Sequence, residues 1–257
     1  MLIISHRGAS GYAPENTLKA FELALSMGAK NFEFDVHLTR DKVLVVHHDY
    51  TLKKTAGAGR HCPQSVPRAL RAAGADAKIS DLNFADLKKF NVARHPPRAS
   101  NLFQHAPGLD EVMEIIGQKS ELINFEIKND GNVYPGIEKA VIRFIKSQNV
   151  FKKSVVSSFD RPTMKRMRTL DADIRLGFLR HKLLPSIIAE SIKQAKLINC
   201  ESFHINARLV LPCVVEKIHN SGLQVYVYTV NTKKEAVQML DIGVDGIFSD
   251  FPDILEK

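Results

Sequence analysis

The most chemically suggestive stretch of the sequence is residues 31–49, where acidic and histidine side chains alternate with apolar ones. Glu33 and Asp35 are two positions apart, so on a β-strand they share one face, opposite Phe32 and Phe34. Two carboxylates placed in this way could hold a hard divalent cation, which prefers oxygen ligands. The pattern also fits a half-buried strand whose polar face meets water. This stretch alone leaves both interpretations open.

Polar side chains of the same kinds follow several other predicted strands. They are His6 and Arg7, His48 and Asp49, Glu126 and Lys128, Ser157 and Ser158, Tyr228 to Asn231, and Asp250. The carboxyl ends of the strands of a parallel barrel meet at one rim, so these groups are expected to lie together. Carboxylates that close repel one another and raise their own pKa values unless a cation neutralises them. Their convergence therefore favours a divalent metal.

The basic and histidine side chains of this set point to phosphate chemistry. Arg7 offers a forked guanidinium and Lys128 a compact ammonium, and both suit a bound phosphate. His6 and His48 can exchange protons near neutral pH, so one can act as a base and the other as an acid. Together with a metal, these groups suit cleavage of a phosphodiester, in which negative charge builds on the phosphoryl group.

Regular alternation of strands and helices must position these residues. Strands are predicted at 2–6, from Asn31, and at 122–128, 154–159, 174–179, 202–206, 224–230 and 246–249. Helices are predicted at 17–27, 109–116, 134–147, 161–170, 184–196, 212–221 and 232–243. Residues 43–47 return too soon after the second strand for a parallel crossover and are predicted to form a hairpin arm. Eight parallel strands with intervening helices indicate a (β/α)8 TIM barrel.

Residues 51–105 interrupt this rhythm and are predicted to form a small insertion after the second strand, within a single domain of residues 1–257. The segment is rich in glycine and proline, and it has one short helical signal at residues 81–90. It carries ten lysines and arginines against three aspartates. No nucleic-acid-binding motif accompanies this basic excess, so a nucleic-acid partner is not expected. Two interpretations of the basic excess remain: a solvated surface, or attraction of an anionic small molecule.

Composition and segment patterns bear on the cellular compartment. No apolar run approaches the roughly 18 residues of a membrane span, so stable membrane insertion is not expected. The N-terminus lacks a secretory pattern and runs straight into the first strand. Cys62, Cys200 and Cys213 have neither metal-binding spacing nor the density of a disulfide scaffold. A cytoplasmic protein is expected, and its oligomeric state is not indicated.

The chemically suggestive motifs also resemble those of a known family. They are His6-Arg7-Gly8, Glu15-Asn16-Thr17, Glu33-Phe34-Asp35, His48-Asp49, Glu126-Ile127-Lys128 and the run from Gly243 to Asp250. In order and spacing they resemble the glycerophosphodiester phosphodiesterase family over nearly the whole chain. The resemblance implies a TIM barrel with an insertion after the second strand. It also implies metal-dependent hydrolysis of glycerophosphodiesters, such as glycerophosphocholine or glycerophosphoethanolamine, to glycerol 3-phosphate and an alcohol.

The resemblance also implies a role for each matching residue. His6 and His48 would be the acid and base pair, and Glu33, Asp35 and Glu126 would bind one divalent metal, Mg²⁺ or Ca²⁺. Arg7 and Lys128 would contact phosphate. Glu15 would orient the loop of His6 and Arg7. In the mechanism proposed for the family, the 2-hydroxyl of glycerol attacks phosphorus while a histidine protonates the leaving alcohol. Water then opens the cyclic phosphate. His48 is the expected acid.

Two departures from the family pattern concern the substrate. Leu52-Lys53-Lys54-Thr55 stands where the family usually has an Arg-Thr-Thr-Gly run, so any role of that arginine does not carry over. Tyr228 stands where many members have tryptophan, which should alter packing around glycerol or the leaving group. Phe159 is expected to line the same pocket, with core packing as the alternative.

Two other functions compete with the leading hypothesis. One is a phospholipase D-like cleavage of lysophospholipids on the same type of barrel, whose members are typically secreted and disulfide-bonded. The other is a barrel that binds phosphodiesters without catalysis. The presence of both histidines and all three carboxylates argues against the second, since a dead enzyme has no chemical reason to keep all five.

Overall fold

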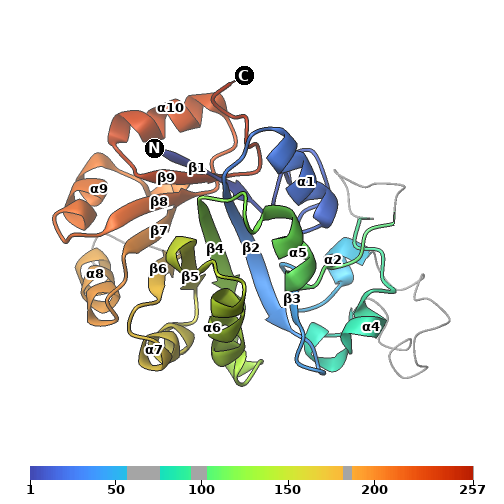
Figure 1. Ribbon diagram of the computed structural model, residues 1–257. Helices are drawn as coiled ribbons and strands as arrows, with labels where there is room; N and C mark the ends of the chain where they lie inside the picture. The colour runs from blue at the N-terminus through green and yellow to red at the C-terminus, as the bar shows by residue number, and fades with distance from the viewer. Residues whose placement is uncertain (57–75, 94–102, 182–186, 257) are drawn as a thin grey trace.

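The computed structural model describes residues 1–56, 76–93, 103–181 and 187–256. Eight parallel strands form a closed barrel in the order β1-β9-β8-β7-β6-β5-β4-β2, and β1 pairs with β2 to close it (Figure 1). They are β1 (Leu2–His6), β2 (Asn31–Leu38), β4 (Leu122–Ile127), β5 (Ser154–Ser158), β6 (Arg175–Arg180), β7 (Ser202–Asn206), β8 (Gln224–Tyr228) and β9 (Gly246–Ser249). The predicted TIM barrel is confirmed.

The predicted hairpin arm is the short strand β3 (Leu44–Val46), which runs antiparallel to β2. Val36 pairs with Val46 and Leu38 with Leu44, so the arm follows the carboxyl half of β2 back toward the acidic residues. The arm lies outside the barrel's closed circuit, because β2 already pairs with β1 and β4. Its position delivers His48 to the barrel mouth.

Seven helices of eight or more residues surround the barrel in the described part of the chain (Figure 1). They are α1 (Leu18–Ser26), α5 (Leu109–Ile116), α6 (Ile137–Ser147), α7 (Arg161–Leu170), α8 (Ile188–Leu197), α9 (Pro212–His219) and α10 (Lys233–Ile242). Side chains mark several of their starts: Thr17 accepts from the backbone N–H of Ala20, and Asp160 accepts from that of Thr163.

One predicted helix start differs from the structure by three residues, and another falls on residues that the structure does not describe. The helix predicted from Tyr134 begins at Ile137, because Gly136 takes a left-handed conformation just before it. The helix predicted from Leu184 is seen as α8 from Ile188, and residues 182–186 lie outside the described residues.

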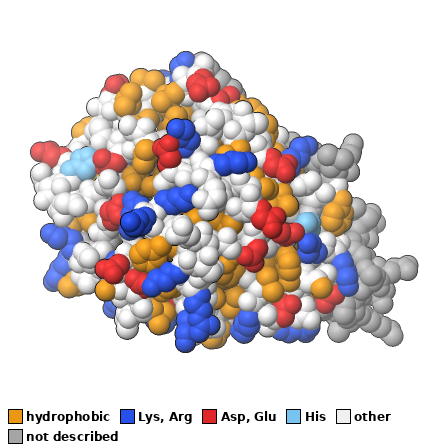
Figure 2. All heavy atoms as spheres, viewed as in Figure 1, with side chains coloured by type: hydrophobic (Ala, Val, Ile, Leu, Met, Phe, Trp, Pro, Cys, Tyr) orange, Lys and Arg blue, Asp and Glu red, His pale blue; other side chains and the backbone are white. Residues whose placement is uncertain are grey.

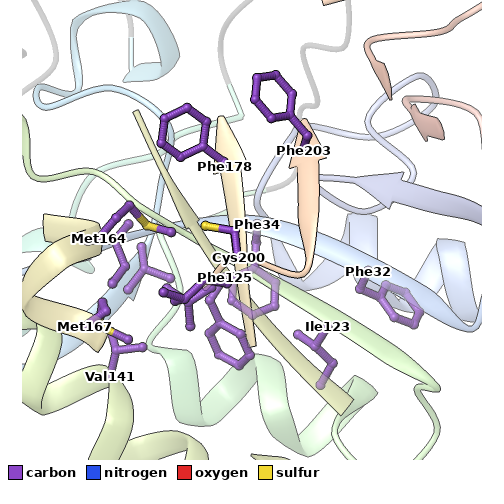
Figure 3. Close-up of a cluster of buried hydrophobic side chains, with 14 of the residues drawn as sticks. Phe32, Phe34, Ile123, Phe125, Val141, Met164, Met167, Phe178, Cys200 and Phe203 are labelled. Atoms are coloured by element: carbon purple, nitrogen blue, oxygen red, sulfur yellow. The ribbon is translucent and has the colours of Figure 1, made fainter. Parts of the chain in front are cut away.

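The main hydrophobic core lies between the strands and the surrounding helices. Phe34 of β2 meets Phe125 of β4 edge to face, with ring centroids 4.9 Å apart. Figure 3 shows part of this layer, in which Met164 and Met167 of α7 belong to the same buried cluster. Because strand side chains alternate, outward-facing Phe34 requires Glu33 and Asp35 to point into the barrel.

Burial of the acidic face of β2 excludes one interpretation of the sequence. Only 2% of Glu33 and none of Asp35 is exposed, so the alternative of a water-exposed polar face is wrong. Closure of the barrel places both faces of every strand inside the protein, one against helices and one in the barrel interior. The interior below the mouth holds a separate apolar cluster that includes Ile4, Tyr226 and Phe248.

Between β3 and α5, the described residues form short helical turns beside the barrel (Figure 1). They are α2 (Lys53–Ala56), η2 (Ile79–Asp81) and α4 (Phe84–Leu87). The single helix predicted at 81–90 is therefore shorter, because Leu82 and Asn83 adopt extended conformations after η2. Leu52 and Leu87 belong to a small buried cluster of this region. The division into one domain with an insertion at 51–105 stays a prediction.

The predicted basic excess of this segment falls partly on residues 57–75 and 94–102, which lie outside the described residues together with Cys62. On the face shown in Figure 2, basic and acidic side chains are interspersed with apolar ones. Among the described helices, none has the length and apolar character needed to cross a lipid bilayer.

Candidate active site

A cavity of about 290 Å³ opens at the carboxyl ends of the barrel strands. Its lining includes His6, Arg7, Glu33, His48, Asp49, Tyr50, Asn124, Glu126, Lys128, Asp130, Phe159, Leu179, His181, His204, Tyr228, Thr229 and Phe248. These residues come from strands far apart in the sequence, and the parallel arrangement of the barrel brings their ends together.

Three carboxylates gather on one side of the cavity. Glu33, Asp35 and Glu126 each offer an oxygen atom, and these atoms lie within 4.8 Å of one another. The register of the sheet explains the grouping, because Asp35 of β2 is paired directly with Glu126 of β4. All three side chains point into the barrel, which is the arrangement that the sequence predicts.

The three carboxylates are not equally compensated. Burial raises the pKa of Glu33 well above its usual value, and the neighbouring charges of Asp35 and Glu126 raise it further. Burial would also raise the pKa of Asp35, but Lys128 and Arg7 hold it well below its usual value. The positive charges of Lys128 and Arg7 therefore outweigh the burial of Asp35, but they do not offset the burial and the neighbouring negative charges at Glu33.

Arg7 is fixed among the acidic side chains by its backbone and its guanidinium. Its Nε lies 3.1 Å from Asp35 Oδ2, and one terminal nitrogen donates to Glu15 Oε2 at 3.0 Å. The residue adopts φ 58°, a left-handed conformation that costs free energy outside glycine. Gly8 follows at φ 78°, where an added Cβ would meet the Ala20 backbone at 2.7 Å. The sharp turn thus requires Gly8.

Lys128 lies between two of the carboxylates. Its Nζ is 2.9 Å from Asp35 Oδ1 and also donates to Glu126 Oε1. Burial would lower the pKa of Lys128, but Asp35 and Glu126 raise it above its usual value, so the ammonium is charged throughout the physiological range.

His6 is held by a carboxylate that directly follows the last strand, β9. Its Nδ1 lies 2.6 Å from Asp250 Oδ1, while its Nε2 lies 3.9 Å from Glu33 Oε2. Ser10 and Asn231 also donate to Asp250, at 2.9 and 2.7 Å. Burial would raise the pKa of Asp250, but the bond with His6 lowers it to about 2. An ionised Asp250 therefore orients the His6 ring, with Nε2 on the side of Glu33.

His48 is held in a similar way by its neighbour in sequence. Its Nδ1 lies 2.8 Å from Asp49 Oδ1, and Lys54 lies 3.2 Å from the same carboxylate. The hydrogen bond with His48 lowers the pKa of Asp49, and Lys54 lowers it further. Both histidines therefore have Nδ1 engaged with a carboxylate, which fixes the ring and leaves Nε2 for exchange of a proton.

Aromatic residues form another part of the cavity wall. The rings of Phe159 and His181 are stacked with centroids 3.5 Å apart, and Tyr228 meets Phe159 edge to face at 6.1 Å. The Tyr228 hydroxyl donates to the backbone carbonyl of Arg180 at 2.7 Å, so its ring faces the cavity. Lys128 Nζ lies 5.8 Å from the centre of the Phe159 ring and connects this wall to the charged side.

The residues present fit a divalent cation. Glu33 Oε1 is buried, and no hydrogen-bond donor among the described residues reaches it. A buried oxygen without a partner is costly, and a cation would both satisfy it and reverse the raised pKa of Glu33. The donor set consists of carboxylate oxygens, which hard ions such as Mg²⁺ and Ca²⁺ prefer over softer metals.

The structure brings the sequence-predicted residues into one site. His6, His48, Arg7, Lys128, Glu33, Glu126, Phe159 and Tyr228 line the cavity, Asp35 lies among the carboxylates, and Glu15 binds Arg7. Phe159 lines the cavity, as expected, and the alternative that it packs in the core does not apply. The individual roles stay predictions.

Four further residues contact the predicted site residues, although the sequence analysis assigned them no role. They are Asn16, which donates to Asp35 at 2.9 Å, Asp49, Asp250 and His181. Asn16, Asp49 and Asp250 lie within the quoted motifs, so their position beside predicted site residues was a usable signal. His181 follows β6 with no such signal, and only the fold places it against Phe159.

Comparisons with known proteins agree with this geometry. The sequence pattern of the glycerophosphoryl diester phosphodiesterase family matches residues 6–254. The chain belongs to this family. A glycerophosphodiester phosphodiesterase of Bacillus altitudinis is 34% identical to it over 254 residues, covering 98% of this chain and 95% of the relative. A second, from Caldanaerobacter subterraneus subsp. tengcongensis, is 31% identical and covers 99% and 96%.

Solved structures of the glycerophosphoryl diester phosphodiesterase family share the barrel. A phosphodiesterase of Oleispira antarctica, solved in complex with the product sn-glycerol-3-phosphate, superposes with a TM-score of 0.79. It is 25% identical, and the match covers 100% of this chain and 95% of that one. The prediction of a phosphoric diester hydrolase is confirmed.

More distant relatives carry another name. A lysophospholipase D of Homo sapiens is 26% identical to this chain and matches 97% of it and 83% of the human protein. Membership of the family therefore leaves the choice between glycerophosphodiesters and lysophospholipids to the site itself.

Proposed function

We propose that the protein hydrolyses glycerophosphodiesters, such as glycerophosphocholine or glycerophosphoethanolamine, to glycerol 3-phosphate and the free alcohol. The observation that carries the proposal is the meeting of three carboxylates, including a buried Glu33 with an unpartnered oxygen, with two carboxylate-held histidines in one cavity. A phosphodiester is the substrate that such a set of proton carriers, cations and oxygen ligands suits best.

The cationic residues bind and orient the phosphate in this proposal. Arg7 and Lys128 lie on the carboxylate side of the cavity and stay charged, because Asp35 raises the pKa of both. Each is already paired with Asp35, so both cations are fixed before substrate binds and need little reorganisation when charge develops on phosphorus.

His6 and His48 move the protons. We assign His6 as the base that takes the proton of the glycerol 2-hydroxyl through Nε2, as that oxygen attacks phosphorus. We assign His48 as the acid that gives a proton to the leaving alcohol oxygen. Asp250 and Asp49 hold the two rings in place through Nδ1. In the second stage the roles reverse, and water opens the cyclic phosphate.

Glu33, Asp35 and Glu126 would hold the single divalent metal, Mg²⁺ or Ca²⁺. When bound, the metal would supply Lewis-acid stabilisation to the negative charge of the phosphoryl oxygens. Glu15 contributes indirectly, because its bond to Arg7 supports the left-handed turn that follows β1.

Phe159 and Tyr228 would contact the alcohol portion of the substrate. Their rings line the cavity and meet each other edge to face. This apolar wall also keeps lysophospholipids as a second candidate substrate: if the acylated glycerol lay against it instead of the alcohol, the acyl chain would gain from the apolar surface.

The decisive experiment is release of glycerol 3-phosphate from glycerophosphocholine and glycerophosphoethanolamine by the purified protein. It compares added Mg²⁺, added Ca²⁺ and excess chelator, with lysophosphatidylcholine as a parallel substrate. Metal-dependent glycerol 3-phosphate release supports the proposal. Turnover of the lysophospholipid alone would replace it with a lysophospholipase D activity, and no turnover of any of these would contradict it.

We also propose that the protein works in the cytoplasm. Cys200 and Cys213 are free thiols in the structure, in keeping with a reducing compartment. Fractionation of the native host would test this, and recovery outside the cytoplasm would contradict it.

A further inference from the structure

His37 is a buried polar side chain next to the site, and the proposed reaction gives it no task. It lies on β2 on the same face as Asp35, and none of its surface is exposed. Its ring meets the rings of Tyr50 and Tyr134 edge to face, with centroids 5.3 and 5.4 Å away. This packing holds the imidazole plane in one orientation.

Both ring nitrogens of His37 have partners. Nδ1 lies 2.8 Å from the Tyr134 hydroxyl, and Nε2 lies 3.2 Å from the backbone carbonyl oxygen of His48. A carbonyl oxygen can only accept, so Nε2 carries the hydrogen and donates it to His48. Nδ1 then accepts from the Tyr134 hydroxyl. The three groups form one directed chain from Tyr134 through His37 to the main chain of His48.

The bond to His48 continues the attachment of the hairpin arm beyond its strand. Pairing of β3 with β2 ends at Val46, followed by one bond from the His47 N–H to the Asp35 carbonyl at 3.0 Å. The imidazole of His48 is bound to Asp49, which belongs to the same arm and cannot anchor it to the barrel. His37 therefore links the His48 main chain to β2.

Tyr134, the other end of the chain, is itself anchored. Only 2% of it is exposed, and its backbone N–H donates to Asn129 Oδ1 at 2.8 Å. Buried Asn129 donates in turn to Glu138 and Thr163, at 3.1 and 3.2 Å. Since Asn129 directly follows Lys128, the network connects the loop after β4 to the arm that carries His48.

We propose that His37 is a positioning residue for His48: together with Tyr134 it fixes the backbone at His48 and thereby the direction of the His48 imidazole. The inference rests on the proposed function, in which His48 transfers a proton to the leaving alcohol. Proton transfer and attack require reacting atoms at near-contact distance, so a displacement of about 1 Å can cost roughly 10²-fold in rate.

Two amide substitutions separate the two bonds of His37. In His37→Gln the amide nitrogen reaches the position of Nε2, so the bond to His48 is retained. In His37→Asn the shorter amide reaches only the position of Nδ1, so the bond to His48 is lost. We expect His37→Asn to lower kcat by roughly 10- to 100-fold and His37→Gln to recover most of it. KM and the metal affinity measured by calorimetry should not change in either.

A double-mutant cycle tests whether the effect passes through His48. Once His48→Ala has removed the imidazole, His37→Asn should cause no further loss of the remaining rate. If His37 instead supports the fold or the carboxylates, the same factor should be lost in both backgrounds. Equal losses in the two backgrounds, or equal kcat for the Gln and Asn variants, would overturn the proposal.

The cycle also keeps this inference distinct from the proposed function. Full activity of the single variant His48→Ala would contradict the proposed role of His48, whatever His37 does. If His37→Asn fails to fold, Tyr134→Phe removes only the hydroxyl that holds Nδ1. It should lower kcat by a smaller factor that also disappears in the His48→Ala background, and persistence of that factor there would again overturn the proposal.

Discussion

The two halves of the cavity are built from different kinds of side chain. The ends of β1, β2, β4 and β9, with the β3 arm, supply His6 and His48, the cations and the carboxylates, which are linked to one another by ion pairs. Strands β5 to β8 and the residues that follow them supply Phe159, Leu179, His181, His204, Tyr228 and Thr229, and no carboxylate among the described lining residues. Charge is concentrated where the phosphate would react, and apolar surface where the alcohol would lie.

This difference has consequences for substitution. In the charged half, buried groups such as Asp35 depend on their partners, so removal of one member leaves another unpaired. In the aromatic half, contacts are mainly those of packed rings, and replacement of one ring removes surface without stranding a charge. We therefore expect losses of rate from the first half and changes in substrate preference from the second.

The largest effect is expected from the two proton carriers. His6→Ala and His48→Ala should each lower kcat by roughly 10²-fold or more, the usual scale of general acid or base catalysis. Glycerol 3-phosphate release measures this, with far-ultraviolet circular dichroism to verify the fold. His219→Ala is the matched control, because His219 also pairs with an aspartate, Asp245, but lies on α9 outside the cavity. Full activity in either site variant would remove that histidine from the mechanism.

The next largest effect concerns metal binding by the charged half. Glu126→Gln keeps the size of the side chain and removes a charged oxygen. Loss of a residue that only supports a metal ligand already lowers metal affinity by roughly 10-fold, so loss of a ligand should lower it by at least that factor. Isothermal titration with Mg²⁺ and with Ca²⁺ measures this directly. Unchanged affinity would remove Glu126 from the ligand set. Glu114→Gln is a suitable control, because Glu114 lies on α5 outside the cavity.

A smaller effect is expected from the aromatic half. Phe159→Leu should raise KM for glycerophosphodiesters with bulky alcohols by roughly threefold to tenfold, the range that one aromatic pair contributes. It should change kcat little, because the ring touches none of the proton carriers. Steady-state kinetics on glycerophosphocholine and on glycerophosphoglycerol test this. A fall in kcat with constant KM would mean that the two halves are not separate in function.

The smallest effect is a pH dependence of stability from the barrel interior. Burial lowers the pKa of His204 to about 3, below the ordinary value of about 6.5. Between these values the unfolded chain binds the extra proton, so this histidine stabilises the fold above about pH 6.5 and loses that contribution as the pH falls toward 3. Denaturant unfolding measures the free energy of unfolding at pH 7 and at pH 5. Between these two pH values it should decrease less for His204→Asn than for the unsubstituted protein. An equal decrease would show that His204 does not contribute.

Much of the charged half could be predicted from sequence because its residues lie in short motifs at strand ends. Alternation along β2 places Glu33 and Asp35 on one face, and the short span before His48 requires a hairpin. These are local rules with fixed geometry. Less of the aromatic half could be predicted, because an aromatic residue after a strand fits a pocket wall and a hydrophobic core equally well.

Details that depend on distant contacts were not available from the sequence. The helix predicted at 81–90 is reduced to α4, because Leu82 and Asn83 are extended, and Leu82 belongs to the small buried cluster beside β3. The stacking of His181 on Phe159 joins the loops after β6 and β5, whose relative position depends on closure of the barrel. The partners of His37 come from the segment after β3 and from the loop after β4.

The sequence by itself determined which residues can do chemistry and which ends of which strands carry them, because side-chain type and strand period are local properties. Only the tertiary structure decided that the acidic face of β2 is buried and that Asp250, just after the last strand, holds His6 of the first. It also decided that Glu33 Oε1 has no hydrogen-bond partner among the described residues, while Asp35 has two cations. Burial and pairing depend on all the strands that close the barrel, and no local pattern contains that information.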